Sequence, residues 1–197
     1  MPSERAVAEM VIQLGRASCC DNLHGLNAAQ WTALRFFSRA NRFSRTVSGF
    51  AEFHLTTKGT ASQTVKSLVS RGLLMRTPSE RDGRSVTMDL TSLGRAMLAQ
   101  DPLEMLVGAV ARLPDPQRDQ LEAGLARVLE DVACMRGKRL FGGCAGCTCL
   151  SWTGQTPICR LLGEPLEQEE TGQICINFRP EPPEDESGTA DAGVVEP

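Results

Sequence analysis

The segment from Thr57 to Arg84 constrains the fold more than any other part of the chain. Apolar residues recur at helical spacing along its first half and mark one face of a helix, at Ala61, Val65, Leu68 and Val69. The opposite face is polar and holds no acidic side chain. Gly72 supplies a stop signal, and two strand-forming runs then flank a Gly-containing turn. This order predicts a short helix followed by a β-hairpin.

A polar helix face beside a basic hairpin is typical of DNA-binding proteins. The helix fits the major groove, and the hairpin reaches phosphates or the minor groove. Gln63 can form a bidentate pair with adenine, and Lys66 can reach guanine or a phosphate. Arg84 suits a wing contact, or a salt bridge with Asp82 that shapes the turn. An ordinary surface helix and hairpin is the alternative. We predict double-stranded DNA as a partner, contacted by Lys58, Thr60, Ser62, Gln63, Thr64, Lys66, Arg81 and Arg84.

The charge distribution favours the same function. The net charge of -3 hides an excess of basic residues in the first part of the chain, with 19 Lys and Arg against 14 Asp and Glu over residues 1–140. Residues 141–197 hold 2 against 10. Over residues 34–95 the count is 11 against 4, so the positive charge lies around the predicted DNA-reading helix. Phosphate neutralisation supplies most non-specific affinity for DNA.

Further helices are predicted on both sides of this unit. They cover residues 3–20, 27–40, 46–55, 91–113 with a bend at Pro102, and 117–139, and a basic turn occupies residues 41–45. The first helix and the last two carry more apolar surface than a small three-helix core can cover. This surplus predicts a homodimer built from both ends of the domain, as two-fold DNA readers need paired half-sites. The alternative is that these helices wrap the core of a monomer.

Residues from about 27 to 100 resemble a MarR-type winged helix. The resemblance rests on TKGTASQTVKSLVSRGLL from Thr57, on RDGRSVTMDLTSLGRA from Arg81, on the wing element Asp82-Gly83-Arg84, and on the closing Leu-Thr-x-x-Gly-Arg pattern over residues 90–95. It implies a mainly α fold with a small antiparallel β-wing and flanking dimerisation helices. It also implies a homodimeric transcriptional regulator, usually a repressor. The cysteine-rich segment after residue 140 departs from the common members.

Five of the eight cysteines lie in that segment. Cys144, Cys147, Cys159 and Cys175 follow the spacing C-x2-C-x11-C-x15-C, and Cys149 adds a possible further thiol. Small residues between the first two let the backbone aim both sulfurs at one ion. Four thiolates suit zinc or a [4Fe–4S] cluster, and metal-free redox thiols are a third alternative. We hypothesise that metal loss or oxidation repositions the dimer helices and changes DNA affinity.

These patterns predict three regions: a DNA-binding and dimerisation domain over residues 1–140, a cysteine-rich metal or redox segment over 141–179, and a disordered acidic tail over 180–197. A bound metal would supply the stability of the middle region. Cys134 is expected to be buried on the last helix. Of the adjacent Cys19 and Cys20, one thiol is expected to be buried and the other exposed to solvent. The exposed thiol could sense oxidants.

Other classes of protein are disfavoured. No Ser/His/Asp set, phosphate-cradling Gly loop or paired carboxylates point to an enzyme. No run is long and apolar enough for a membrane span, and the start lacks an apolar signal core, so a cytoplasmic location is expected. The competing interpretation is a protein-interaction module with a degenerate winged helix and a structural zinc site. A small-molecule or redox effector stays open.

Overall fold

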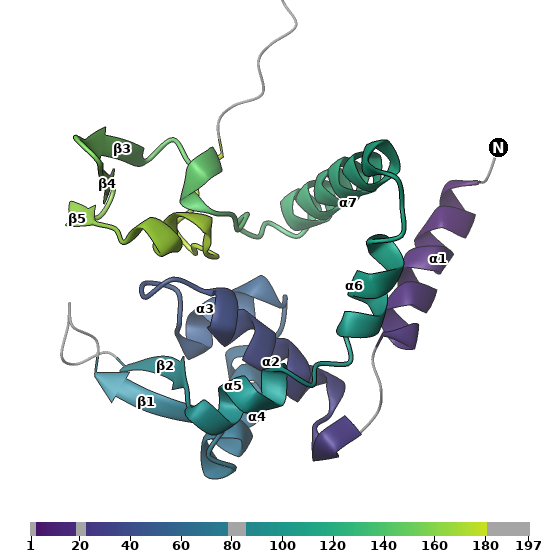
Figure 1. Ribbon diagram of the computed structural model, residues 1–197, viewed down its shortest axis with the longest axis horizontal. Helices are drawn as coiled ribbons and strands as arrows, with labels where there is room; N and C mark the ends of the chain where they lie inside the picture. The colour runs from purple at the N-terminus through teal and green to yellow at the C-terminus, as the bar shows by residue number, and fades with distance from the viewer. Residues whose placement is uncertain (1–2, 19–22, 79–85, 181–197) are drawn as a thin grey trace, which may run out of the picture.

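A computed structural model describes residues 3–18, 23–78 and 86–180, and Figure 1 shows their arrangement. The winged-helix unit is built from helices and one antiparallel hairpin: η1 (Leu23–Gly25), α2 (Ala28–Arg39), α3 (Val47–Phe53), α4 (Lys58–Ser70), β1 (Leu74–Pro78), β2 (Val86–Leu90) and α5 (Ser92–Leu98). The hairpin pairs Leu74 with Leu90 and Pro78 with Val86. This is the predicted mainly helical fold with a small β-wing.

One apolar core holds the unit together. Its largest members are Trp31, Leu34, Phe36 and Phe37 of α2. The predicted apolar face of α4 packs into the same core, since Ala61, Val65 and Leu68 are buried there. Phe50 of α3 and the wing residues Leu74, Met88 and Leu90 close it. The amphipathic pattern therefore fixes which side of α4 points outward.

The Leu-Thr-x-x-Gly-Arg pattern fastens the wing to the rest of the unit. Thr91 caps α5 by accepting the Gly94 N–H at 3.0 Å, and its own hydroxyl donates to the Gly72 carbonyl at 2.6 Å. A Cβ atom at Gly94 would lie 2.2 Å from the Leu73 carbonyl oxygen. Arg95 donates to the Leu90 carbonyl at 2.8 Å. Each position of the pattern thus serves the junction between α4, the wing and α5.

Three further helices project from one side of the unit, namely α1 (Glu4–Ala17), α6 (Glu104–Val110) and α7 (Asp115–Met135). The prediction of one bent helix over 91–113 was wrong, because the chain around Pro102 separates α5 from α6. None of the residues within α1, α6 and α7 is buried. Large apolar side chains stand exposed on all three, and Leu129 is 69% exposed. No helix within the described residues has the length and apolar character to cross a bilayer.

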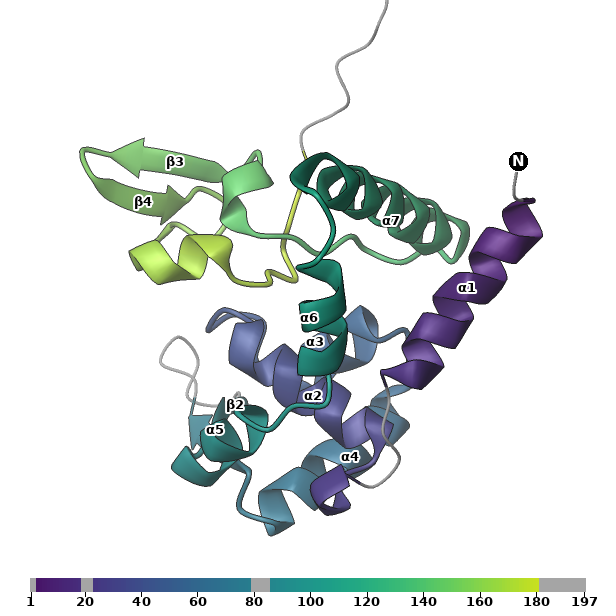
Figure 2. The same cartoon turned by 45° about the vertical axis from the view of Figure 1, so that its right-hand side comes forward.

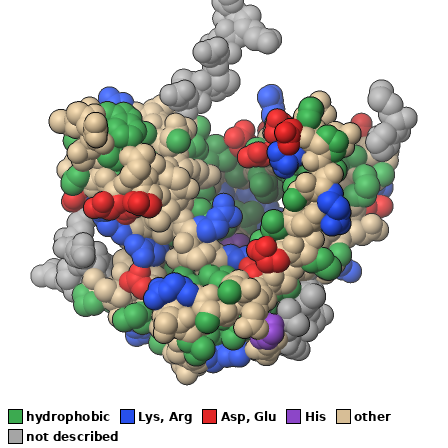
Figure 3. Space-filling view, viewed as in Figure 1, with side chains coloured by type: hydrophobic (Ala, Val, Ile, Leu, Met, Phe, Trp, Pro, Cys, Tyr) green, Lys and Arg blue, Asp and Glu red, His purple; other side chains and the backbone are tan. Residues whose placement is uncertain are grey.

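The cysteine segment has secondary structure that the sequence did not predict. It forms a small antiparallel sheet between two short 3-10 helices: η2 (Cys144–Gly146), β3 (Leu150–Thr153), β4 (Thr156–Cys159), β5 (Glu164–Pro165) and η3 (Gln168–Gly172). Figures 1 and 2 place it on the side of the winged-helix unit away from α4. Ile174 of this segment is part of the main core. Figure 3 shows acidic side chains gathered on the segment at the left.

Candidate DNA-reading surface and cysteine cluster

The outward face of α4 presents the predicted base-reading residues. Lys58, Thr60, Gln63 and Lys66 are exposed, and Ser62 and Thr64 are partly exposed. The helix begins at its Thr57 cap, whose hydroxyl accepts the Thr60 N–H at 3.1 Å. No acidic residue occurs between Lys58 and Ser70. The surface therefore offers amide, hydroxyl and ammonium groups without a carboxylate that would repel phosphates.

Some of the hydroxyls on α4 already have partners. The Thr60 hydroxyl lies 2.9 Å from that of Thr57, and the Thr64 hydroxyl donates to the Thr60 carbonyl at 3.2 Å. Ser67 accepts a hydrogen bond from the buried Gln30 of α2 at 2.8 Å. Ser67 therefore fastens α4 to α2. Gln63 and Lys66 are the members of the set best suited to reach beyond the helix.

The wing contributes cations that the sequence pattern did not single out. The predicted contacts Arg81 and Arg84 lie outside the described residues. Arg76 stands exposed on β1, directly opposite Met88 in the hairpin register. Alternation from the buried Leu74 would place Arg76 on the inner face of the strand, so no local pattern points to it. Arg45, from the turn after α2, forms an ion pair with Asp89 of β2, with 2.5 Å between Nη1 and Oδ1.

The structure brings together the four predicted ligand residues. Cys144, Cys159 and Cys175 are buried, Cys147 is partly exposed, and all four thiols are free. Burial, together with the charges of Cys175, Cys147 and Cys159, raises the pKa of Cys144 to about 11. The charges of the other three thiols thus act on Cys144, although Cys175 lies 31 residues away in sequence.

Hydrogen-bond donors surround the cluster. The Arg179 N–H donates to the Cys147 sulfur at 3.4 Å. Burial raises the pKa of Cys175, while the Asn41 side chain and the Asn177 N–H act to lower it. Such N–H groups stabilise thiolates. Within the described residues, however, no group of three or more His, Cys, Asp or Glu side chains stands in metal-ligating geometry. The donor set fits a thiolate-ligated metal in its chemistry, and the side chains would have to close on the ion.

The other cysteines differ in position. Cys149 is partly buried beside the cluster. Cys134 is exposed on α7, so the prediction that it is buried was wrong. Its helix has no buried face in the described protomer. Cys19 and Cys20 lie outside the described residues, as does the predicted acidic tail beyond Pro180.

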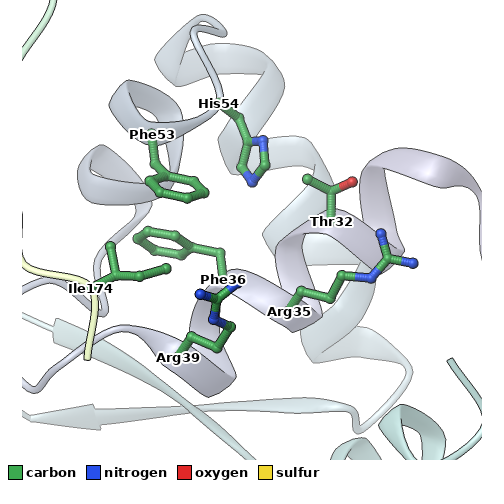
Figure 4. Close-up of a pocket in the computed structure, with 7 residues that line it drawn as sticks. All are labelled: Thr32, Arg35, Phe36, Arg39, Phe53, His54 and Ile174. Atoms are coloured by element: carbon green, nitrogen blue, oxygen red, sulfur yellow. The ribbon is translucent and has the colours of Figure 1, made fainter. Parts of the chain in front are cut away.

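A pocket of about 270 Å³ lies where the cysteine segment meets the winged-helix unit. Figure 4 shows its lining, in which aromatic rings and guanidinium groups stand beside a threonine and an isoleucine: Thr32, Arg35, Phe36, Arg39, Phe53, His54 and Ile174. Arg35 is held by Asp101 through Nε–Oδ2 and Nη2–Oδ1 contacts of 2.7 and 2.5 Å. Burial and the charge of Arg35 lower the pKa of His54 to about 4, so its imidazole is neutral near pH 7. The pocket thus combines an apolar wall with positive charge.

Comparisons with known proteins agree with this architecture. The MarR family model matches residues 24–85. The S. aureus MepR–DNA complex is 18% identical over 66% of this chain and 96% of that chain, with a TM-score of 0.54. A mutant of E. coli MarR is 21% identical over 66% and 97%, with a TM-score of 0.50. No curated protein matches the chain. MarR regulators are DNA-binding proteins rather than enzymes, in line with the absence of a predicted catalytic site. Residues 24–85 of this chain thus match the MarR family model, and its described part shares the winged-helix fold of these structures.

Proposed function

We propose that the chain is a homodimeric, sequence-specific DNA-binding repressor whose affinity is tuned by a cysteine-ligated metal centre. The observation that carries DNA binding is the exposed face of α4, which holds Lys58, Gln63 and Lys66 and no acidic residue. Its opposite face is fixed in the core, so the outward direction of these groups is preset. The acidic cysteine segment lies on the other side of the unit, where its charge is kept from the DNA phosphates.

Binding to duplexes tests this proposal directly. The protein should select a preferred duplex from a random pool and bind it with an affinity that falls steeply with salt. Gln63→Ala should weaken the selected duplex by about 1–3 kcal/mol and leave non-specific binding nearly unchanged. Lys66→Ala should weaken specific and non-specific binding alike. It should also lower the slope of log affinity against log salt concentration by about 1.

Lys138→Ala is the matched control, because it removes the same charge from an exposed position after α7. It should leave affinity and slope close to those of the unaltered protein. A protein-interaction module that only retains the winged helix would show no salt-dependent binding to any duplex. Repression is then tested with a reporter gene placed behind the selected duplex.

The homodimer would use the exposed apolar residues of α1, α6 and α7. Val11 and Ile12 of α1, Met105 of α6, and Leu129 of α7 are between 44% and 69% exposed, far more than helices of a self-contained monomer require. A second copy of the chain is the occupant that also supplies a second reading helix. Leu129→Asp should shift sedimentation from dimer to monomer. Leu161→Asp, an equally large change on the cysteine segment, should leave the dimer intact.

The metal centre would be held by Cys144, Cys147, Cys159 and Cys175, with Cys149 as a spare thiol. Its support is the charge effect of the other three thiols on Cys144 and the Arg179 N–H that donates to the Cys147 sulfur. Four thiolates suit tetrahedral zinc or a [4Fe–4S] cluster. Protein purified without oxygen should contain one zinc per chain and be colourless, or contain iron and sulfide and be brown. Cys159→Ser should lose most of the metal. If the purified protein contains neither zinc nor iron and sulfide, redox-active thiols without a metal are the remaining alternative.

A further inference from the structure

Helix α6 leaves the winged-helix unit through the short connection 99–103, and this connection holds one buried carboxylate. Asp101 is 8% exposed. It accepts two hydrogen bonds from Arg35 of α2, with Nε–Oδ2 and Nη2–Oδ1 contacts of 2.7 and 2.5 Å. Its Oδ1 also accepts the Leu103 N–H at 2.8 Å, and its carbonyl accepts the Glu104 N–H at 3.1 Å. Asp101 therefore ties the core helix α2 to the start of α6.

The form of this ion pair fixes a direction as well as a distance. Two N–H groups of one guanidinium bond two oxygens of one carboxylate, a geometry that a lysine ammonium cannot reproduce. The side chains of Arg35 and Asp101 are 21% and 8% exposed, so salt screens the pair much less than a pair on the surface. Although burial acts to raise the pKa of Asp101, the hydrogen bonds from Arg35 and from the Leu103 N–H hold it below its usual value. The carboxylate is therefore charged near pH 7.

Packing does little to set the direction of α6 within the described protomer. None of the residues of α6 is buried, and Leu103 at its start provides no side-chain cap. Met105 and Val107 of α6 are 61% and 48% exposed. The Arg35–Asp101 pair thus supplies a directional contact between α6 and α2 that apolar packing does not.

The same helix α2 also carries the reading helix. Gln30 of α2 donates to the Ser67 hydroxyl of α4 at 2.8 Å, and the apolar faces of α2 and α4 share the main core. Helix α2 therefore has two links, one to α4 through Gln30 and the core, and one to α6 through Arg35, five residues later. A change in the direction of α6 relative to α2 would move α4 relative to the surface that we assign to the dimer.

We propose that Arg35 is a positioning residue that fixes α6 through Asp101 and thereby sets the separation of the two reading helices in the dimer. This inference rests on the proposed homodimeric DNA-binding function and adds what determines its choice of duplex. Two-fold DNA readers contact half-sites about 34–36 Å apart, which is one helical turn of the duplex. Helix α4 reads the bases within each half-site, whereas the Arg35–Asp101 pair sets the spacing between the half-sites.

The test compares binding of the full-length protein to the selected duplex and to a duplex with extra base pairs inserted between its half-sites. The unaltered protein should prefer the selected duplex by at least about tenfold, because the insertion displaces and rotates one half-site. Arg35→Lys keeps the charge and loses the forked geometry. It should bring the ratio of the two affinities close to one and leave the slope of log affinity against log salt concentration unchanged.

A second variant and a control complete the test. Asp101→Asn keeps an oxygen for the Leu103 N–H but loses the second acceptor for Arg35, so it should change the ratio as Arg35→Lys does. Arg42→Lys is the matched control, because it makes the same change in a similarly buried pair, with Glu170, that contacts the cysteine segment instead of α6. It should keep the preference for the selected duplex.

The outcomes separate this inference from the proposed function. Protein that binds no duplex, or that binds as a monomer, overturns the proposed function and the inference together. Dimeric protein that binds both duplexes equally overturns the inference alone. The same holds if Arg35→Lys and Asp101→Asn weaken both duplexes by one factor, because a pair that only stabilises the fold would act in that way. Asp101→Asn decides the matter if Arg35→Lys fails to fold.

Discussion

At the scale of single residues, His54 ties the stability of the winged-helix unit to pH. Its ring packs against Phe50 and Phe53, with centroids 5.0 and 4.9 Å away, and its buried Nε2 has no partner among the described residues. Burial and Arg35 lower its pKa from 6.5 to about 4. The unfolded chain takes up a proton as the pH falls through 6.5, while the folded chain does so only near 4. Stability should therefore fall across that window.

Replacing the imidazole should remove this loss. His54→Phe fills the same aromatic site without a titrating group or an unpaired nitrogen. Its advantage over the unaltered protein should grow between pH 6.5 and pH 4 by on the order of 1–2 kcal/mol, allowing for the partial exposure of the ring. Denaturant unfolding at several pH values measures the difference, and His54→Leu checks that ring size is not the cause. A difference independent of pH would contradict the assignment.

At the scale of elements, the junction between the wing and α5 depends on the absence of a side chain at Gly94. A Cβ atom there would stand 2.2 Å from a backbone oxygen, which cannot rotate away. Gly94→Ala should therefore separate α5 from β1 and destabilise the unit by about 2–4 kcal/mol. Gly124→Ala in α7 is the control, because nothing lies within 4 Å of its added methyl group. It should be neutral or stabilising. Thermal melting of the two variants measures both effects.

The elements also show where local pattern stops being informative. Helix α4 was predictable because its apolar period and its Thr57 cap are local signals. The sheet β3–β5 was not, because its strands are short and lie among cysteines and glycines without a clear alternation. Asn41 and Ser44 were predicted only as part of a basic turn. Their burial results from contacts with Ile174 and Ile176, more than 130 residues later, and no local pattern encodes it.

The predicted reading surface shows the same division. The outward direction of Gln63 and Lys66 follows from helical periodicity. The role of Ser67 does not, since only the packing of α2 against α4 gives its hydroxyl a partner. Likewise, the convergence of Cys144 and Cys147 follows from their spacing, whereas that of Cys159 and Cys175 depends on how the sheet and the turn fold back.

At the scale of the whole molecule, the cysteine segment and the winged-helix unit should unfold as one. Ile174 is 8% exposed and lies in the core that contains Phe36. The buried Glu170 pairs with Arg42, and Phe141 meets Phe53 edge-on at 5.2 Å. Contacts of this kind oppose independent unfolding, because opening the segment would expose part of the main core. We expect a single cooperative transition in calorimetry.

Ile174→Ala tests this cooperativity at its centre. The loss of a buried side chain of this size should lower the free energy of unfolding by about 2–4 kcal/mol. The melting temperature of the whole unit should fall as well, even though Ile174 lies outside α4. Hydrogen exchange of the Val65 and Leu68 amides reports on α4 directly. The opening free energy derived from their exchange rates should fall by the same amount. Ile158→Ala is the comparison, since Ile158 sits in β4 within the segment's own sheet and outside the main core. If Ile174→Ala leaves exchange in α4 unchanged, the segment opens by itself, and the winged helix does not depend on it.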